Sequence, residues 1–166
     1  MDKKTQKKYH KLSYKRVRNI TGTRFDFLFV IDGFESIDMF EITGLKASSM
    51  KDGVYPIIIC RCEMMGCGGI YITTHIQGED IIWERFWDGQ SCEFTDDEEV
   101  LPEYTIGSQY GEGGEHLVIT APMRFKLKEY TELAAELLKE SDKSDKNKAQ
   151  FKENLERYLS GDVLIP

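Results

Sequence analysis

Residues 70–87 have the sequence IYITTHIQGEDIIWERFW, in which two runs of β-branched and aromatic residues flank the short turn 77–79. In the first run an isoleucine or a threonine stands at every second position from Ile70 to Ile76, which is the side-chain period of a strand. A short turn that contains glycine between two such runs is typical of antiparallel pairing. This pattern predicts a β-hairpin, with strands at 70–76 and 81–87.

Further strands are predicted on both sides of this hairpin. Four segments have the composition of strands, although the first has only a loose alternation that fits an edge strand: 12–20, 24–31, 55–62 and 116–121. The stretch 34–53 mixes apolar residues with glycines in no clear period and receives no assignment. The N-terminal two thirds of the chain is therefore predicted to be mainly β.

The period of the apolar residues changes near the C-terminus. From Lys126 they fall three or four positions apart, at Leu127, Tyr130, Ala134, Leu137 and Leu138, which predicts an amphipathic helix. A second amphipathic helix is predicted between an Asn147 cap and a Gly161 stop. Strands followed by helices predict an α+β fold, a mainly antiparallel sheet with two C-terminal amphipathic helices packed on it.

Length and composition limit the class of protein. The chain has 166 residues, which predicts a single domain, 1–166. Nine Phe, eight Tyr and two Trp exclude a wholly disordered chain, and the longest apolar runs, 27–31 and 56–60, are far too short to span a membrane. No secretory signal is visible, and four cysteines are too few for a disulfide scaffold. We therefore expect a cytoplasmic protein with reduced thiols and no membrane partner.

Charge is distributed unevenly along the chain. The net charge is −7, yet residues 1–18 carry eight basic residues and one acidic residue. By contrast, residues 79–103 hold ten acidic residues and one basic residue. We expect residues 1–8 to form a flexible basic arm on an acidic body. Binding to nucleic acid is not expected, because the acidic body would repel phosphates.

The acidic stretch suggests a surface for a protein partner. Asp96, Asp97, Glu98 and Glu99 lack the spacing of a calcium loop, so a solvated loop is the simplest interpretation. Aromatic residues beside charge are also common at interfaces. The alternative is therefore an acidic docking surface for a basic partner, made of Trp83, Glu84, Phe86, Trp87, Asp96, Asp97, Glu98 and Glu99.

Three cysteines form the compact motif C-x-C-x4-C. Cys60 and Cys62 share one face of a predicted strand, and the following turn could return Cys67 to them. Zinc needs a fourth ligand, which His75 or Cys92 could supply, although neither has a motif spacing, and Asp and Glu are abundant enough to supply it by accident. We expect small buried apolar side chains and no metal or other cofactor, with a zinc site and a redox pair as the alternatives.

The segment around these cysteines resembles a known group of proteins. Residues 54–87, with PIIICRCEMMGCGG followed by the strand that contains Ile82-Trp83-Glu84, are similar to small uncharacterised bacterial proteins. Those proteins share a C-x-C-x4-C turn between strands followed by a strand with the pattern V/I-x-W. The resemblance implies a bacterial cytoplasmic protein with a β-hairpin around the cysteines, and it implies no catalytic residue.

Two function classes remain open at this level. The favoured one is a non-enzymatic protein-binding module, such as a bacterial immunity or antitoxin-like protein that offers carboxylates to a basic partner. The alternative is an enzyme of unknown class with a site around His75, His116 and the cysteines 60–67. The glycine-rich loops 66–69 and 111–114 lead into predicted strands, so we expect them to be turns. The oligomeric state stays open.

Overall fold

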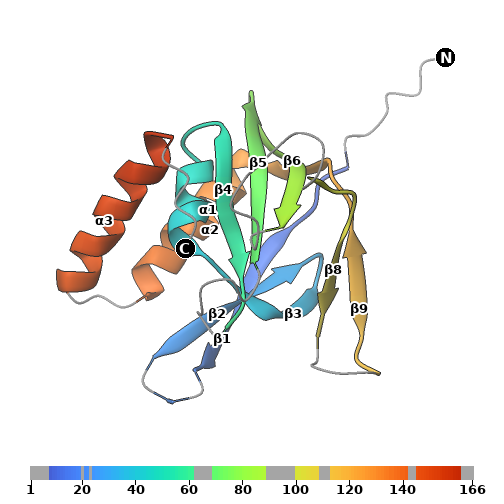
Figure 1. The fold of residues 1–166 in the computed structure, drawn as a ribbon, viewed down its shortest axis with the longest axis horizontal. Coiled ribbons are helices and arrows are strands. Elements are labelled where there is room, and N and C mark those ends of the chain that lie inside the picture. The colour runs from blue at the N-terminus through green and yellow to red at the C-terminus, as the bar shows by residue number, and fades with distance from the viewer. Residues whose placement is uncertain are drawn as a thin grey trace.

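The computed structural model describes residues 8–19, 21–22, 24–61, 69–88, 100–108, 113–141 and 145–161. Within them lies an antiparallel sheet with helices on one side of it (Figure 1). The predicted α+β class is confirmed. The predicted flexible arm, residues 1–8, falls almost wholly outside the described residues.

Seven strands follow one another across the main sheet in the order β1-β2-β3-β4-β5-β6-β10. They are β1 Leu12–Arg18, β2 Phe25–Ile31, β3 Phe34–Phe40, β4 Gly53–Ile59, β5 Gly69–Gln77, β6 Asp80–Asp88 and β10 Met123–Lys126. A short strand, β7 (Val100–Leu101), pairs with β6 beyond the end of β10. Two further strands, β8 (Tyr104–Gly107) and β9 (His116–Ile119), form a separate antiparallel pair.

The predicted hairpin is present as β5 and β6. Gln77 pairs with Asp80 at its tip, and Gly78 has the positive φ of +60° that the turn requires. Strands β1 to β3 cross β4 to β6 at a steep angle, so the sheet is strongly curled (Figure 1). This curl brings the outer strands of the sheet toward each other.

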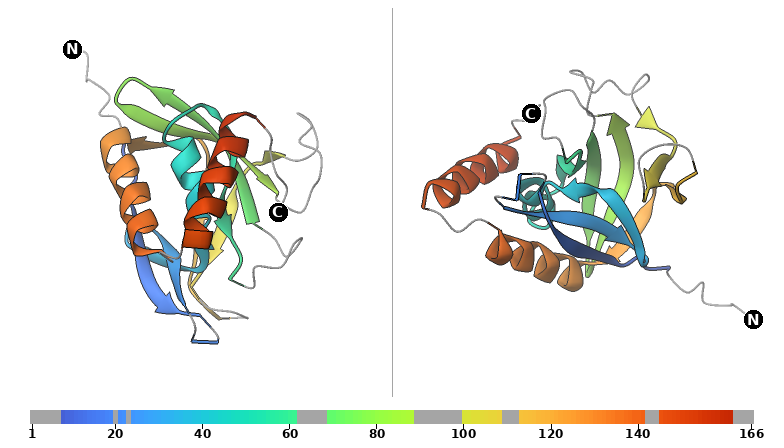
Figure 2. Two further views of the ribbon diagram at one scale, coloured as in Figure 1. Left: turned by 90° about the vertical axis from the view of Figure 1, so that its left-hand side faces the viewer. Right: turned by 90° about the horizontal axis from the view of Figure 1, so that it is seen from below.

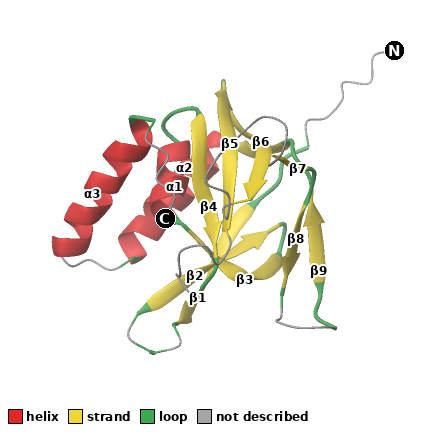
Figure 3. Ribbon diagram, viewed as in Figure 1, coloured by secondary structure: helices red, strands yellow, loops and turns green. Residues whose placement is uncertain are grey.

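Three helices are described, and they lie together on one side of β4–β6, with the β8–β9 pair on the other (Figure 3). Helix α1 (Ile42–Ser48) packs on β4. Helix α2 (Leu127–Glu140) packs on β6, β10 and β1, and helix α3 (Asp145–Leu159) packs mainly on α1. The last helix begins two residues before the predicted Asn147 cap, so that residue lies inside the helix.

The core lies between the sheet and helices α1 and α2. Trp83 of β6 is fully buried there, with its ring centroid 4.6 Å from that of Phe125. Its indole N–H donates to the hydroxyl oxygen of Tyr130 at 3.2 Å, and that hydroxyl lies 2.7 Å from Oγ of Ser48. This chain of polar contacts satisfies the buried polar atoms of the indole and the phenol and links β6, α2 and α1.

Candidate functional site

The two outer strands of the seven-strand path meet just before β1 begins. The backbone N–H of His10 donates to the carbonyl oxygen of Arg124 in β10 at 2.8 Å. Beyond this bond no further backbone bond joins the two strands within the described residues, and α2, which follows β10 directly, lies against β1 (Figure 2). The sheet therefore closes at one point and leaves a groove between α2 and β1.

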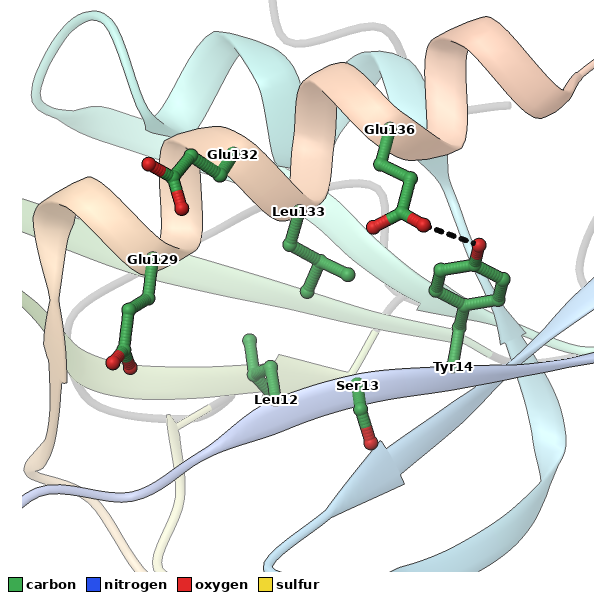
Figure 4. Close-up of a pocket in the computed structure, with 7 residues that line it drawn as sticks. All are labelled: Leu12, Ser13, Tyr14, Glu129, Glu132, Leu133 and Glu136. Carbon is green, nitrogen blue, oxygen red and sulfur yellow. Dashed lines mark hydrogen bonds between the residues drawn. The ribbon is translucent and has the colours of Figure 1, made fainter.

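This groove has a volume of about 250 Å³ and joins residues from distant parts of the chain (Figure 4). Leu12 of β1 and Leu133 of α2 form its apolar part. Its polar lining is Ser13, Tyr14, Glu129, Glu132 and Glu136. The groove thus combines an apolar floor with three carboxylates on the helix.

The helical period places these carboxylates in one row. Glu129, Glu132, Glu136 and Glu140 are three or four positions apart, so they share the exposed face of α2 beside β1. The adjoining face carries the buried residues of the helix, Tyr130, Leu133, Ala134 and Leu137, with Leu133 next to the carboxylates. The apolar stripe that attaches α2 to the core therefore also fixes where the acidic row lies.

One end of the row is engaged with β1, and the other end is free. The Tyr14 hydroxyl donates to Glu136 at 2.9 Å, and Arg16 lies 3.6 Å from Glu140. Burial and the hydrogen bond to Glu136 raise the pKa of the Tyr14 phenol. Within the described part of the chain, Glu129 and Glu132 have neither a hydrogen-bond nor an ion-pair partner. Two adjacent unpaired carboxylates therefore stand over the Leu12 end of the groove.

A second, larger hollow of about 670 Å³ lies beside the first turns of α2. Tyr9 lines this hollow, and its hydroxyl donates to Asp80 at 2.8 Å. Lys126 Nζ lies 5.4 Å from the centroid of the Tyr9 ring. Arg124 also pairs with Asp80. This hollow mixes both signs of charge, and its most buried carboxylate is already engaged, whereas Glu132 lines both hollows.

The prediction that the aromatic residues of β6 form part of an exposed docking surface is wrong. Trp83 and Phe86 are fully buried and Trp87 is 4% exposed, because β6 has pairing neighbours on both edges and covered faces. The Trp87 indole donates to Thr73 Oγ1 at 2.7 Å. Glu84 alone of the four β6 residues is exposed. The acidic residues predicted beside them, Asp96, Asp97, Glu98 and Glu99, lie outside the described residues.

The possible metal and enzyme residues do not come together in the described part of the chain. His75 lies at the β4 end where Gly53 pairs with Thr74, whereas Cys60 follows the opposite end of that strand. At about 3.3 Å per residue the two are separated by roughly 20 Å, so His75 does not complete a site at Cys60. Cys62, Cys67 and Cys92 lie outside the described residues. No group of three or more His, Cys, Asp or Glu that could hold a metal ion is found among the residues that are described.

The histidines have other surroundings. His75 Nδ1 lies 2.7 Å from Asp52, which also accepts the Ile76 N–H at 2.7 Å. The backbone bond from Ile76 and the contact with His75 lower the pKa of the Asp52 carboxyl. His116 is exposed on β9, opposite Gly107. His75 is half-buried and His116 is exposed, and within the described residues neither is hydrogen-bonded to a nucleophile, so the enzyme alternative gains no support from this geometry.

Sequence reasoning missed the groove itself. The signal for its acidic half is present, because Glu129, Glu132 and Glu136 follow the same helical spacing as the apolar stripe from Leu127. The signal for its other half is not local, because Tyr14 and Glu136 are 122 positions apart.

No protein family, curated protein or solved structure matches this chain. In the described residues, no helix is both long enough and apolar enough to cross a membrane.

Proposed function

We propose that this chain is a non-enzymatic protein-binding module that accepts a basic segment of a partner protein in the groove between α2 and β1. The observation that carries the proposal is the pair Glu129 and Glu132, exposed and unpaired within the described residues, above the apolar floor of Leu12 and Leu133. Carboxylates and an apolar floor suit opposite ends of the same ligand side chain.

Lysine and arginine fit such a lining. Their apolar stems cover hydrophobic surface while the cationic heads stay near water. In this groove the stem would lie on Leu12 and Leu133 and the head would reach Glu129 or Glu132. The net charge of −7 would also steer a basic partner toward the protein and disfavour an acidic one.

A bacterial immunity or antitoxin-like role in the cytoplasm is the finer form of this proposal. A nuclease that binds phosphates needs a basic cleft, and carboxylates presented by a small acidic protein could occupy that cleft. The row on α2 supports this reading, since Glu129, Glu132 and Glu136 are exposed on a helix held firmly by the core.

The proposal is tested with a fluorescent peptide of alternating lysine and threonine, compared with its glutamate–threonine counterpart. We expect the lysine peptide alone to bind in an anisotropy titration, more weakly as salt is raised. Because exposed ion pairs are worth about 0.2–1 kcal/mol each, the double variant Glu129→Gln/Glu132→Gln should lose roughly two- to thirtyfold in affinity.

The matched control is Glu153→Gln/Glu156→Gln, which removes the same charge from the exposed face of α3. Its affinity should stay close to that of the unchanged protein. The proposal is wrong if the lysine peptide does not bind, or if both double variants weaken binding equally.

A further inference from the structure

Strand β1 has one edge that β2 leaves free. Asp32 N–H donates to the Lys11 carbonyl oxygen at 2.9 Å, and Asn19 N–H donates to the Arg24 carbonyl oxygen at 2.9 Å. Both bonds fit the register of β1 on β2, in which Leu12 stands opposite Ile31. In an antiparallel pair such bonds recur at every second residue, so the odd-numbered residues of β1 bond to β2. The N–H and C=O groups of the even-numbered residues point away from β2.

The two ends of this outward series are occupied, and its middle is open. At one end the His10 N–H is taken by Arg124 of β10, and at the other the Arg18 carbonyl accepts from the Arg61 guanidinium at 3.0 Å. Between them, the outward backbone groups of Leu12, Tyr14 and Arg16 have no partner among the described residues. They lie along the same groove as the acidic row of α2.

We propose that the partner segment binds as an extended strand added to this edge of β1, an inference that rests on the proposed function and specifies its mode. Addition of a strand to an open sheet edge is a recurrent mode of peptide recognition, in which backbone bonds supply affinity and side chains supply specificity. The occupant is an extended basic segment of a different protein.

The spacing of the carboxylates suits such a strand. Glu129, Glu132 and Glu136 are separated along α2 by about 4.5 and 6 Å, at about 1.5 Å per residue. Side chains on one face of a strand recur at about 6.7 Å. The long side chains of lysine and arginine can span the difference of about 2 Å, so two such residues at alternate positions of an added strand would face Glu129 and Glu132.

The charges of β1 itself favour a partner over a second copy. Lys15 pairs with Glu35 at 3.1 Å and Arg16 with Glu140 at 3.6 Å. These cations therefore do not neutralise the carboxylates at the Leu12 end of the groove, which remain available to a basic ligand. In a β1–β1 pair between two copies, Lys15, Arg16 and Arg18 would face like charges, which destabilises cross-strand pairing.

The basic arm of the same chain is also a poor occupant. Tyr9 bonds to Asp80, and His10 bonds to Asp32 at 2.7 Å as well as to Arg124. The arm could fold back along β1 only by breaking these contacts. A chain that lacks residues 2–7 should therefore bind the lysine–threonine peptide with unchanged affinity.

The inference is tested by comparing Arg16→Pro with Arg16→Ala in the same titration. Both variants lose the contact with Glu140, but only proline removes the outward N–H, and β2 does not use that N–H. We expect Arg16→Pro to weaken peptide binding at least about tenfold and Arg16→Ala by less than about threefold.

A second measurement uses the unchanged protein and needs no variant to fold. The backbone nitrogens are methylated either at every lysine or at every threonine of the peptide. Because these residues alternate, each pattern blocks the backbone N–H donors on one edge of the peptide only. We expect one of these two peptides to lose binding and the other to keep it, because only one edge faces β1.

The inference is overturned if both methylated peptides bind equally and Arg16→Pro binds like Arg16→Ala. In that case the proposed function still stands if Glu129→Gln/Glu132→Gln lowers the affinity. A rise in affinity on removal of residues 2–7 would overturn it in favour of the chain's own arm. A dimer in sedimentation that Arg16→Pro converts to a monomer would overturn it in favour of a second copy.

Discussion

Glu41 lies at the junction of β3 and α1, where its carboxylate caps the helix. It accepts the Gly44 N–H at 2.7 Å and the Thr43 N–H at 3.3 Å. Burial nevertheless outweighs these bonds and raises the pKa of the Glu41 carboxyl to about 7. The protein therefore holds a carboxyl group that changes its charge near neutral pH, with Tyr71 of β5 and Tyr158 of α3 close enough to be affected by it.

This shift predicts a pH-dependent stability. Because the pKa of Glu41 is higher in the folded chain than the ordinary value of 4.5, the folded state binds a proton more strongly than the unfolded state. With respect to this group, the free energy of unfolding should be highest at and below pH 4.5, and that contribution should be lost as the pH rises from 4.5 through about 7. Glu41→Gln should flatten that fall, as measured by urea denaturation at pH 5 and pH 8. Glu153→Gln, an exposed change, should leave the slope unaltered.

Gly44 has a different constraint, which is space. A Cβ atom at this position would lie 1.6 Å from the carbonyl oxygen of Pro56, so here the backbone of α1 lies directly against the backbone of β4. Gly44→Ala should therefore separate the two elements and lower the free energy of unfolding by about 2–3 kcal/mol. The control Gly78→Ala meets no atom within 4 Å and bears only the strain of its φ of +60°, about 1 kcal/mol. Equal losses in thermal denaturation would contradict this account.

At the scale of elements, helices α2 and α3 differ in how much they bury. Leu137 of α2 is fully buried against the core, whereas Leu155 of α3 is half-buried and packs on the edge of it. Leu137→Ala should cost about 3 kcal/mol and Leu155→Ala about 1 kcal/mol in chemical denaturation. Faster amide exchange in α2 than in α3 would contradict this ranking.

The elements that sequence reasoning found are those with a local signature, which is either a clear period or the composition of a strand. The hairpin at 70–87 and the helix from Leu127 each bury one periodic face, so their patterns were sufficient. Helix α1 has only seven residues and is held by the Glu41 cap and its contact with β4, which leave no periodic signature. The aromatic residues of β6 were misplaced because composition cannot show that a strand lies inside a sheet.

At the scale of the molecule, the predictable part ends where distant strands meet. The order β1 to β6 follows the chain, but β10 returns to pair with β6, opposite Trp83. That pairing and the bond between His10 and Arg124 create the groove from segments that are far apart in the sequence and share no local pattern. The acidic row of the site could be predicted from helical spacing, whereas its position beside β1 could not.

The same anchoring predicts which part of the N-terminal region the fold needs. Removal of residues 2–7 should change the melting temperature by no more than a few degrees, because polar terminal residues bury little. Removal of residues 2–10 should cost clearly more, since it also removes the Tyr9–Asp80 and His10–Asp32 contacts. Circular dichroism melts of the two shortened chains test this, and equal melting temperatures would contradict it.

The closure of the sheet through a single backbone bond also has a consequence for synthesis on the ribosome. The bond between His10 and Arg124 joins an early segment to a late one, so β1 emerges long before the strand that meets its edge. Until β10 and α2 emerge, Trp83, which stacks on Phe29, lacks the cover that Phe125 and Tyr130 later provide. The nascent chain therefore exposes the Trp83 indole together with an open strand edge, a combination that favours chaperone binding during translation.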